Sequence, residues 1–312
     1  LSFGNQNDVG ALSDMARRIA FGDLDGDGDL DIVTGTNEDN EDYEVVAWQN
    51  DGTPFSGTWL SQNVGATDEE VETIEIADFD QDGDMDIFTA NKEASSGDEL
   101  ILWQNDGTPF SGTWSSNVVE SSSKAVEVGG IGDVDNDGDI DIVVGHPRTA
   151  TWEIVIYEND GSPFSSEWTS QNVGQSSGGT YEATFGDLDN DGDLDIASAQ
   201  DGNEDYEVIV WENDGTPFDG TWSSSQDVGT VCSGTCASAY SVDVGDLDND
   251  GYNDLMVTAE SGADYEVLVW KNDGTPFSGL WSGNDVGTTG QTTEMAKLAD
   301  FDLDGDLDIV SI

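Results

Sequence analysis

The sequence of 312 residues predicts an all-β repeat protein built from four-stranded antiparallel units, and two recurring motifs carry this prediction. An aspartate-rich loop begins at Asp23, Asp78, Asp133, Asp187, Asp246 and Asp300. The motif Asn-Asp-Gly-(Thr/Ser)-Pro-Phe begins at Asn50, Asn105, Asn159, Asn213 and Asn272. Both recur every 54 to 59 residues, and a constant period indicates a repeat architecture. Four short strands in each period are typical of a β-propeller blade.

The first period shows how one unit yields its four strands. Residues 18–21 form a strand that enters the aspartate loop, and residues 30–34 form the strand that leaves it. Residues 43–48 are rich in β-forming side chains and give the third strand. The Asn50 motif then favours a tight turn, and its Pro54 cannot continue a strand. The fourth strand covers residues 59–64.

Aromatic side chains recur in phase with these strands. The third strands carry Trp48, Trp103, Trp211 and Trp270, with Tyr157 in the remaining period, and the fourth strands carry Trp59, Trp114, Trp168, Trp222 and Trp281. We interpret both sets as packing between neighbouring blades rather than as ligand-stacking residues, because large aromatic side chains dominate protein cores.

The two ends of the sequence predict a shared blade. Residues 1–10 match residues 281–287, a fourth-strand stretch, so an N-terminal strand is expected to close the last blade beside strands from residues 295–312. This predicts one propeller domain over residues 1–312, with six blades, or seven if the chain is truncated. The shared blade lacks a third strand and its turn. Either further sequence or another chain then supplies that strand at an unpaired edge.

The aspartate loop has the chemistry of a cation site. Asp23, Asp25, Asp27 and Asp31 stand at positions 1, 3, 5 and 9, and Gly28 stands at position 6. Carboxylates this close need a counter-charge, and Ca²⁺ takes six to eight oxygen ligands in such loops. The spacing is that of the first half of an EF-hand loop, but a β-branched strand follows instead of a helix. The loop is therefore interpreted as a calcium turn between two strands.

Residues 19–33 and 132–147 resemble the FG-GAP/VCBS-type repeats of integrin α-subunit propellers and of related microbial proteins, some of which are lectins. The resemblance covers essentially the whole chain. It implies Asp ligands at positions 1, 3, 5 and 9 and a backbone carbonyl ligand at position 7, where Tyr252 can replace Asp because only its backbone is needed. About six Ca²⁺ ions are implied, one for each loop.

The implied metal-site residues are Asp23, Asp25, Asp27, Asp29 and Asp31; Asp78, Asp80, Asp82, Asp84 and Asp86; Asp133, Asp135, Asp137, Asp139 and Asp141; Asp187, Asp189, Asp191, Asp193 and Asp195; Asp246, Asp248, Asp250, Tyr252 and Asp254; and Asp300, Asp302, Asp304, Asp306 and Asp308.

The net charge of -61, from 68 acidic and 7 basic residues, excludes several classes of partner. Nucleic acid and anionic membranes are polyanions and would be repelled. A hydrophobic content of 35% with 10 Trp argues for a packed core rather than disorder. Six divalent cations would neutralise only about a fifth of the charge, which suggests a secreted or cell-surface protein of a saline or marine microbe.

The two cysteines, Cys232 and Cys236, predict a local disulfide, which fits an oxidising compartment. The alternative is a pair of free thiols; a zinc site would need further ligands, and His146 is the only histidine. The sequence contains no apolar run of 18 residues, so no membrane insertion is expected.

Two faces of each blade differ in their loops. The aspartate loops and Asn-Asp-Gly turns share one face and are nearly uniform, whereas the loops of the other face differ between blades, at residues 37–42, 91–98, 146–151, 201–205, 232–236 and 261–264. Varied loops on a rigid scaffold suggest recognition, although unconstrained drift gives the same pattern. A Glu at the start of each third strand (44, 99, 153, 207 and 266) is interpreted as an acceptor of backbone N–H bonds, with an acid–aromatic sugar site as the alternative.

These observations predict a binding or adhesion module for a glycan or a surface protein. The alternative is a structural subunit that self-assembles into a filament or surface layer through strand addition to the incomplete blade. A polysaccharide-active enzyme is disfavoured, because no pair of acidic residues stands out from the repeat. We therefore expect no enzymatic activity and no catalytic residue.

Overall fold

The computed structural model describes residues 7–12, 15–36, 44–67, 70–92, 100–120, 125–146, 154–165, 167–174, 179–201, 207–220, 222, 224–231, 238–259, 267–287 and 293–311. All regular structure in these ranges is β-strand, as predicted. No helix among them is long and apolar enough to cross a membrane. The chain divides into two compact units, Leu1–Val126 with Asn159–Trp168, and Glu127–Glu158 with Thr169–Ile312. The single domain over residues 1–312 stays a prediction.

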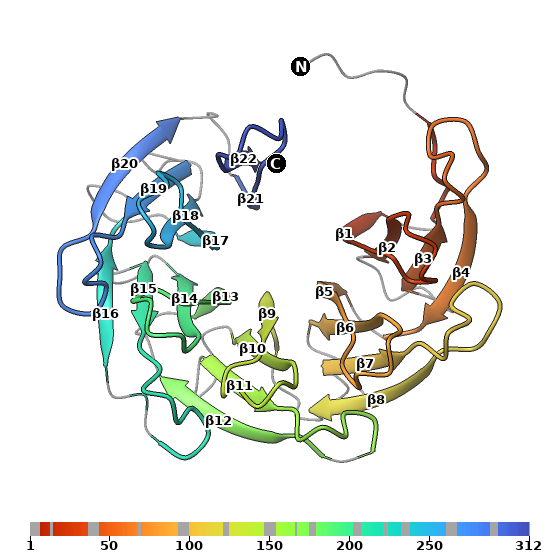
Figure 1. Ribbon diagram of the computed structural model, residues 1–312, viewed down its shortest axis with the longest axis horizontal. Coiled ribbons are helices and arrows are strands. Elements are labelled where there is room, and N and C mark those ends of the chain that lie inside the picture. The colour runs from red at the N-terminus through yellow and green to blue at the C-terminus, as the bar shows by residue number, and fades with distance from the viewer. Residues whose placement is uncertain are drawn as a thin grey trace. The chain divides into compact units, whose positions relative to one another are not determined.

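The first unit contains two four-stranded antiparallel sheets, blades 1 and 2, whose strands follow one another in chain order (Figure 1). Blade 1 consists of β1 (Ala16–Gly22), β2 (Asp31–Thr36), β3 (Val45–Gln49) and β4 (Leu60–Gly65). Blade 2 consists of β5 (Val71–Ala77), β6 (Asp86–Asn91), β7 (Leu100–Gln104) and β8 (Ser115–Glu120). The expected strands of the first period are confirmed to within two residues at each end.

The second unit contains blades 3, 4 and 5 and a two-stranded sheet. Blade 3 consists of β9 (Gly129–Gly132), β10 (Asp141–Gly145), β11 (Ile154–Glu158) and β12 (Thr169–Gly174). Blade 4 consists of β13 (Thr180–Gly186), β14 (Asp195–Gln200), β15 (Val208–Trp211) and β16 (Ser225–Gly229). Blade 5 consists of β17 (Ala239–Gly245), β18 (Asp254–Ala259), β19 (Val267–Lys271) and β20 (Ser282–Gly287). The last sheet pairs β21 (Ala296–Ala299) with β22 (Asp308–Ser311).

The first strands β9, β13, β17 and β21 are neighbours within the second unit (Figure 1). The second strands β14 and β18 are buried along their whole length. Strand β22 pairs only with β21 among the described residues, and three of its four residues are exposed. The third strand that the sequence analysis expects from further sequence or from another chain stays a prediction.

Each complete blade carries a bulge where the third strand meets the fourth. In blade 1, Val45 pairs with Gly65 while Val46 pairs with Asn63, so Val64 is the extra residue. Its side chain is buried, at 6% exposure. The same register shift occurs in the other four blades. A bulge bends the strand locally and increases its twist.

A glycine at the end of the fourth strand packs under a tryptophan of the next blade. A Cβ on Gly65 would lie 1.9 Å from a ring carbon of Trp103 and so overlap it, and Gly174 stands in the same relation to Trp211, at 2.1 Å. The Trp103 Nε1 donates a hydrogen bond of 3.0 Å to Thr89 Oγ1, which fixes the ring plane. The predicted role of the third-strand aromatics in packing between blades is confirmed at these positions.

The fourth-strand tryptophans close the preceding turn. The indole Nε1 of each donates to the carbonyl oxygen of the proline five residues earlier, for example Trp59 to Pro54 at 3.3 Å and Trp281 to Pro276 at 3.0 Å. The same bond forms in blades 2, 3 and 4. These bonds lie within one blade. Packing between blades is seen for Trp114 and Trp222, which contact core clusters that combine residues of neighbouring blades.

Residues 7–10 contact blade 1 in the way that the end of β4 contacts blade 2. They do not themselves form a strand. A Cβ on Gly10 would overlap a ring carbon of Trp48. The Asn7 Nδ2 donates 3.1 Å to Pro54 O, in the Asn-Asp-Gly turn of blade 1. The Gln62 Nε2 likewise donates 3.2 Å to the turn of blade 2. Residues 7–10 thus make the contacts of a fourth-strand stretch, but the expected N-terminal strand is not found in residues 7–12, and its place beside β21 and β22 stays a prediction.

Substitution of Gly65 by Ala is expected to destabilise the protein by about 1–3 kcal/mol, because the Cβ overlaps the Trp103 ring. The matched control is Gly287→Ala, at the same place in β20, where a Cβ would meet no atom within 4 Å. That change should stay within about 0.5 kcal/mol. Urea unfolding measures both, and equal effects would contradict the packing described for Gly65.

Candidate metal centres

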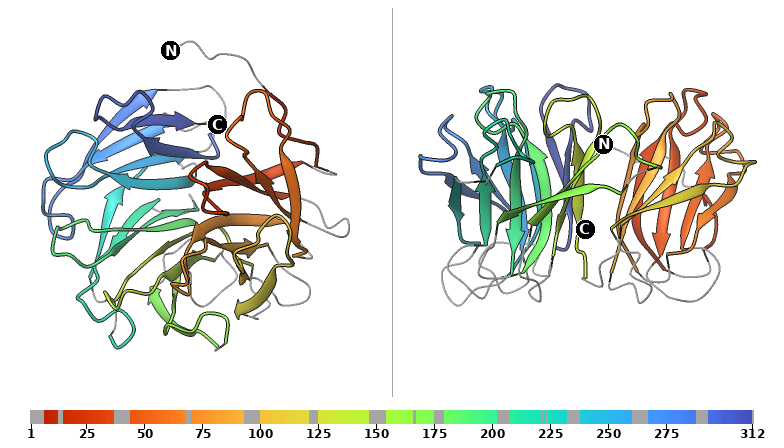
Figure 2. Two further views of the ribbon diagram at one scale, coloured as in Figure 1. Left: turned by 45° about the vertical axis from the view of Figure 1, so that its right-hand side comes forward. Right: turned by 90° about the horizontal axis from the view of Figure 1, so that it is seen from below.

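The aspartate loops connect the first and second strands of each blade, and the Asn-Asp-Gly turns connect the third and fourth. Because the strands alternate in direction, loop and turn project from the same side of each unit (Figure 2). In five loops three carboxylates each offer an oxygen within 4.8 Å of the others, a spacing that one metal ion can bridge. These groups are Asp23, Asp25 and Asp27; Asp78, Asp80 and Asp86; Asp133, Asp135 and Asp141; Asp187, Asp189 and Asp195; and Asp246, Asp248 and Asp250.

The carboxylate at position 1 organises the loop by accepting backbone N–H groups. Asp23 Oδ1 accepts from Asp27 N at 3.1 Å, and its Oδ2 accepts from Gly28 N at 3.0 Å. Gly28 has φ 94°, and the glycines at position 6 of the other loops have φ between 94° and 100°. Residues with a Cβ rarely adopt this region, which explains the glycine. The sixth loop has the same bonds to Asp300, at 3.1 and 3.0 Å.

Position 4 is a structural position that the sequence reasoning missed. It has φ between 58° and 62° in five loops, at Gln81, Asn136, Asn190, Asn249 and Leu303, and Gly26 has φ 71° in the first. In the second unit all three of these asparagines reach the next loop, and Asn190 Nδ2 donates 2.7 Å to Gly251 O. Asn136 Nδ2 donates 2.8 Å to Asp193 Oδ1, and Asn249 Nδ2 donates 2.6 Å to Asp306 Oδ1. The preference of Asn for left-handed backbone was the signal that could have indicated this position.

The carboxylate at position 9 joins the loop to the Asn-Asp-Gly turn. Asp86 Oδ2 accepts from Phe79 N at 3.2 Å, and its Oδ1 accepts from Asn105 N at 2.8 Å. Asp31, Asp195 and Asp254 accept the equivalent pair of bonds in blades 1, 4 and 5. Asp86 is fully buried. The predicted ligand at position 9 is therefore also an anchor that holds the two recurring motifs together.

Burial raises the pKa of these anchor carboxyl groups. The pKa is about 6 for Asp31, about 7 for Asp86 and about 8 for Asp195, although the backbone N–H donors act in the opposite direction. Burial and then the neighbouring carboxylate raise the pKa of Asp135 and Asp189 as well. A bound divalent cation would stabilise the ionised groups, so cation binding would release protons at near-neutral pH.

The donor set fits Ca²⁺, because every side-chain donor in the clusters is a hard carboxylate oxygen. The side chain at position 7 packs against the glycine of the Asn-Asp-Gly turn: Asp29 lies beside Gly52, and the Tyr252 ring lies beside Gly274. The clusters named above contain no position 7 side chain. This agrees with the expectation that position 7 contributes only its backbone, and the occupancy of all six loops stays a prediction.

The residue before the Asn of each turn also faces the loop. Gln49 Nε2 donates 2.6 Å to Asp25 Oδ2, and Gln104 Nε2 donates 2.8 Å to Asp80 Oδ2. Both partners are position 3 carboxylates. The sequence reasoning assigned no role to this residue, because it lies 24 residues from its partner and meets it only when the second and third strands pair.

Most of the varied loops on the other face lie outside the described residues, and so do Cys232 and Cys236 with their predicted disulfide. Two of the five repeated glutamates are described. Glu44 Oε2 accepts from Thr67 N at 3.0 Å, and Glu207 Oε2 accepts from Val231 N at 3.2 Å. Both side chains are buried. The interpretation of these glutamates as acceptors of backbone bonds is confirmed at these two positions.

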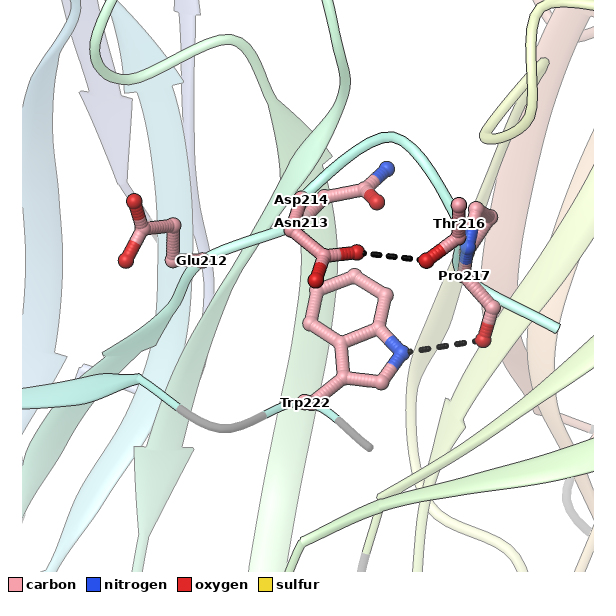
Figure 3. Close-up of a pocket in the computed structure, with 6 residues that line it drawn as sticks. All are labelled: Glu212, Asn213, Asp214, Thr216, Pro217 and Trp222. Carbon is pink, nitrogen blue, oxygen red and sulfur yellow. Dashed lines mark hydrogen bonds between the residues drawn. The ribbon is translucent and has the colours of Figure 1, made fainter. Parts of the chain in front are cut away.

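Two pockets adjoin the Asn-Asp-Gly turn of blade 4. The smaller one lies inside the turn (Figure 3), where Thr216 Oγ1 donates 2.7 Å to Asp214 Oδ1 and Trp222 Nε1 donates 3.2 Å to Pro217 O. The same bonds recur in other blades, so this pocket belongs to the scaffold. The larger cavity has about 370 Å³ and is lined by Asp135, Glu158, Thr169, Gly215, Thr216, Pro217, Phe218 and Asp219.

Five overlapping stretches of the chain match the model of the FG-GAP-like repeat, over residues 23–89, 78–144, 133–198, 187–257 and 246–311. The chain belongs to this family. Each matched stretch runs from one aspartate loop to the second strand of the following blade, so the family is defined by the loops together with the strands around them. The resemblance drawn from the sequence is confirmed, and the blades are those of an FG-GAP β-propeller.

Solved structures share this fold at low sequence identity. A lectin from Agrocybe aegerita, described by its recognition of non-reducing terminal N-acetylglucosamine, is 18% identical, with a TM-score of 0.59 over 94% of this chain and 74% of the lectin. A protein from Lactobacillus plantarum is 14% identical, with a TM-score of 0.59 over 90% of this chain and 74% of that protein. The V. cholerae biofilm matrix protein Bap1 is 15% identical, with a TM-score of 0.50 over 90% of this chain and 40% of Bap1. A comparison with curated proteins found no match.

Unfolding measured in a calcium chelator should distinguish the anchor role of the position 9 aspartate from the metal-binding role of the aspartates. Asp86→Ala leaves two buried backbone N–H groups without their acceptor, so the free energy of unfolding should fall by about 2–4 kcal/mol even without calcium. The control is Asp82→Ala at exposed position 5, which should cost less than about 0.5 kcal/mol in chelator but reduce the stabilisation by added calcium. Chemical unfolding with EGTA and with CaCl₂ measures both, and an Asp86→Ala variant that is destabilised only in calcium would contradict the anchor role.

Proposed function

We propose that this FG-GAP protein is a calcium-stabilised extracellular module that binds a glycan, with a surface protein as the alternative partner. The observation that carries the proposal is the cavity of about 370 Å³ beside blades 3 and 4. Its walls combine the carboxylates of Asp135, Glu158 and Asp219 with the hydroxyls of Thr169 and Thr216, and they include the Phe218 ring. Binding sites of this kind pair apolar surface with a few placed polar groups.

The lining favours a neutral saccharide. Carboxylates and hydroxyls can accept and donate hydrogen bonds to sugar hydroxyl groups, and an aromatic ring can pack against the C–H face of a pyranose. The chain charge of -61 would repel an acidic polysaccharide. The shared fold with the Agrocybe aegerita lectin supports a glycan ligand without indicating which sugar is bound.

Calcium has a structural role in this proposal. An ion that binds the folded loops and not the unfolded chain stabilises the fold in proportion to the logarithm of its concentration over its dissociation constant. The residues at positions 1, 3, 5 and 9 would hold it, with the carbonyl at position 7. The proposed setting is outside the cell, at a surface in a saline environment, on the basis of the acidic composition. We propose no enzymatic activity.

A variant that fills the cavity tests the glycan site. Thr169→Trp places an indole at an exposed position on the cavity wall, so it should abolish glycan-array binding while leaving the melting temperature unchanged. The matched control is Ser115→Trp, at the first position of β8, which has the same burial pattern as β12 and lies outside the cavity lining. This variant should bind as the parent does.

The array distinguishes the two partners. Binding of neutral glycans that Thr169→Trp removes and Ser115→Trp retains would support the site. A parent protein that binds no glycan on the array would contradict a glycan ligand, and the surface-protein alternative would then require binding to intact cells that protease treatment of those cells removes. Loss of binding in both variants would contradict the location of the site in this cavity.

A second candidate function, self-assembly, is favoured by the edge of β22. This strand pairs with β21 alone among the described residues, and Val310 on it is 49% exposed. The second strands of blades 2, 4 and 5 are buried from end to end. An open edge with apolar side chains is a template for adding a strand, here one from another copy of the chain.

Mass photometry tests the assembly function. Dimers or larger species should appear as the protein concentration rises, and a synthetic peptide with the sequence of residues 45–57, a third strand with its turn, should compete for the edge and reduce them. A scrambled peptide of the same composition is the control. Monomers alone at every concentration, or assembly that the peptide leaves unchanged, would contradict strand addition at β22.

A further inference from the structure

The residue before the Asn of each Asn-Asp-Gly turn differs between blades, and it lies beside the aspartate loop. It is Gln49 and Gln104 in blades 1 and 2, Glu158 and Glu212 in blades 3 and 4, and Lys271 in blade 5. In blades 1 and 2 its amide donates to the position 3 carboxylate. This position therefore brings a neutral, an acidic or a basic group to the same point of an otherwise uniform loop.

In blade 5 the residue is a cation that reaches two of the carboxylates of the loop. The Lys271 Nζ contacts Asp248 Oδ2, and it forms an ion pair of 2.7 Å with Asp250 Oδ2. These carboxylates stand at positions 3 and 5. Together with Asp246 they form the group whose oxygens lie within 4.8 Å of one another. The ammonium group thus bridges two of the three side chains that would bind the metal ion.

The loop of blade 5 keeps its conformation with this lysine. Asp246 accepts from Asp250 N at 3.1 Å and from Gly251 N at 2.9 Å, as Asp23 does from its own loop, and Gly251 has φ 94°, the value found at Gly28. Position 7 is Tyr252, whereas the other five loops have Asp there. Compared with its equivalents, this loop has lost one acidic group and gained a basic group.

We propose that the Lys271 ammonium group replaces Ca²⁺ in the loop of blade 5, so that this blade is held by an internal ion pair while the other loops bind calcium. The inference rests on the proposed calcium-stabilised function. A Ca²⁺ ion entering the cluster would have to displace Lys271 from both carboxylates and would meet its positive charge nearby. Calcium affinity at this loop should therefore be at least about tenfold lower than at the loop of blade 1, since charges a few ångströms apart interact strongly.

The residue at this position should also set the relative calcium affinity of the loops in blades 1 to 4. Glu158 lines a cavity together with Asp135, which stands at position 3 of the loop of blade 3. The charge of Glu212 acts on Asp189, at position 3 of the loop of blade 4. Gln49 and Gln104 bring a neutral amide. Additional acidic groups raise the affinity of calcium loops. Calcium should thus fill the loops of blades 3 and 4 first, then those of blades 1 and 2, and should leave that of blade 5 empty.

Exchange of the residue between blades tests the inference. Native mass spectrometry of the full chain with CaCl₂ counts the bound ions. Lys271→Gln, which introduces the residue of blades 1 and 2, should bind one more Ca²⁺ than the parent. Gln49→Lys, which introduces the lysine into blade 1, should bind one fewer. The double variant should bind the same number as the parent.

Lys297→Gln is the matched control, because Lys297 pairs with Glu182 at 3.4 Å on the first strands, away from the loops, and its loss should leave the ion count unchanged. Thermal unfolding supplies a second readout. In EGTA, the melting temperature of Lys271→Gln should be lower than that of the parent, because the loop has lost its internal cation. Added CaCl₂ should abolish this difference, because a bound calcium ion then takes the place of the ammonium group.

The outcomes separate this inference from the proposed function. A parent protein that binds no calcium and melts identically in EGTA and CaCl₂ would overturn the calcium-stabilised function. A parent that binds calcium, with an ion count that neither Lys271→Gln nor Gln49→Lys changes, would overturn the replacement by Lys271 and leave the calcium function standing. A change in ion count in the Lys297→Gln control would also overturn it, because the effect would then not be local to the loop.

Discussion

The structure depends on a buried carboxylate that accepts two backbone N–H groups from different parts of the chain. Asp86 accepts from the amide of Phe79 in its own loop and from that of Asn105 in the turn that follows 19 residues later, and it is fully buried. These bonds fix the distance between the second strand and the third-to-fourth turn. The turn then fixes the neighbouring blade, because Asn105 Nδ2 donates 2.9 Å to Leu24 O in the aspartate loop of blade 1. One aspartate thus organises the interior of a blade and, through the adjacent asparagine, its contact with the previous one.

This arrangement has an electrostatic cost that a cation relieves. The anchor carboxylate is buried next to the carboxylates of positions 1, 3 and 5, and burial raises the pKa of Asp195 to about 8. A cation at the cluster offsets the repulsion, whether it is a divalent ion or, in blade 5, the ammonium group of Lys271. The chain's few basic residues are used in a similar way elsewhere: Arg17 and Arg18 both pair with Glu72, whose side chain is only 1% exposed. With only 7 basic residues in the chain, the other loops depend on the proposed calcium ions for their counter-charge.

The proposed binding function therefore belongs to the surfaces that the aspartate loops hold in place. The cavity beside blades 3 and 4 is lined by Asp135 from an aspartate loop, Glu158 from the end of β11 and Phe218 from a turn, so a loop proposed to bind calcium also forms part of the proposed glycan site. The sequence indicated the varied loops as the binding surface, whereas the glycan site proposed from the cavity lies on the uniform face. A cavity forms there because Glu158 and Thr169 of blade 3 lie next to the turn of blade 4. The turns are nearly uniform, but the side chains that line the space beside them come from the neighbouring blade and differ.

The sequence by itself determined the strands, the loops and the match of the N-terminus to a fourth strand. Those features are local, because alternating side chains, positive-φ glycines and prolines act within a few residues, and the repetition of the motif corrects errors in any one copy. Only the tertiary structure decided what the anchor aspartate binds, which asparagines link adjacent loops, and that Lys271 lies among the carboxylates of blade 5. Each of these contacts joins residues 18 to 57 positions apart, and a charge so distant in sequence affects a site only after strand pairing has brought it there.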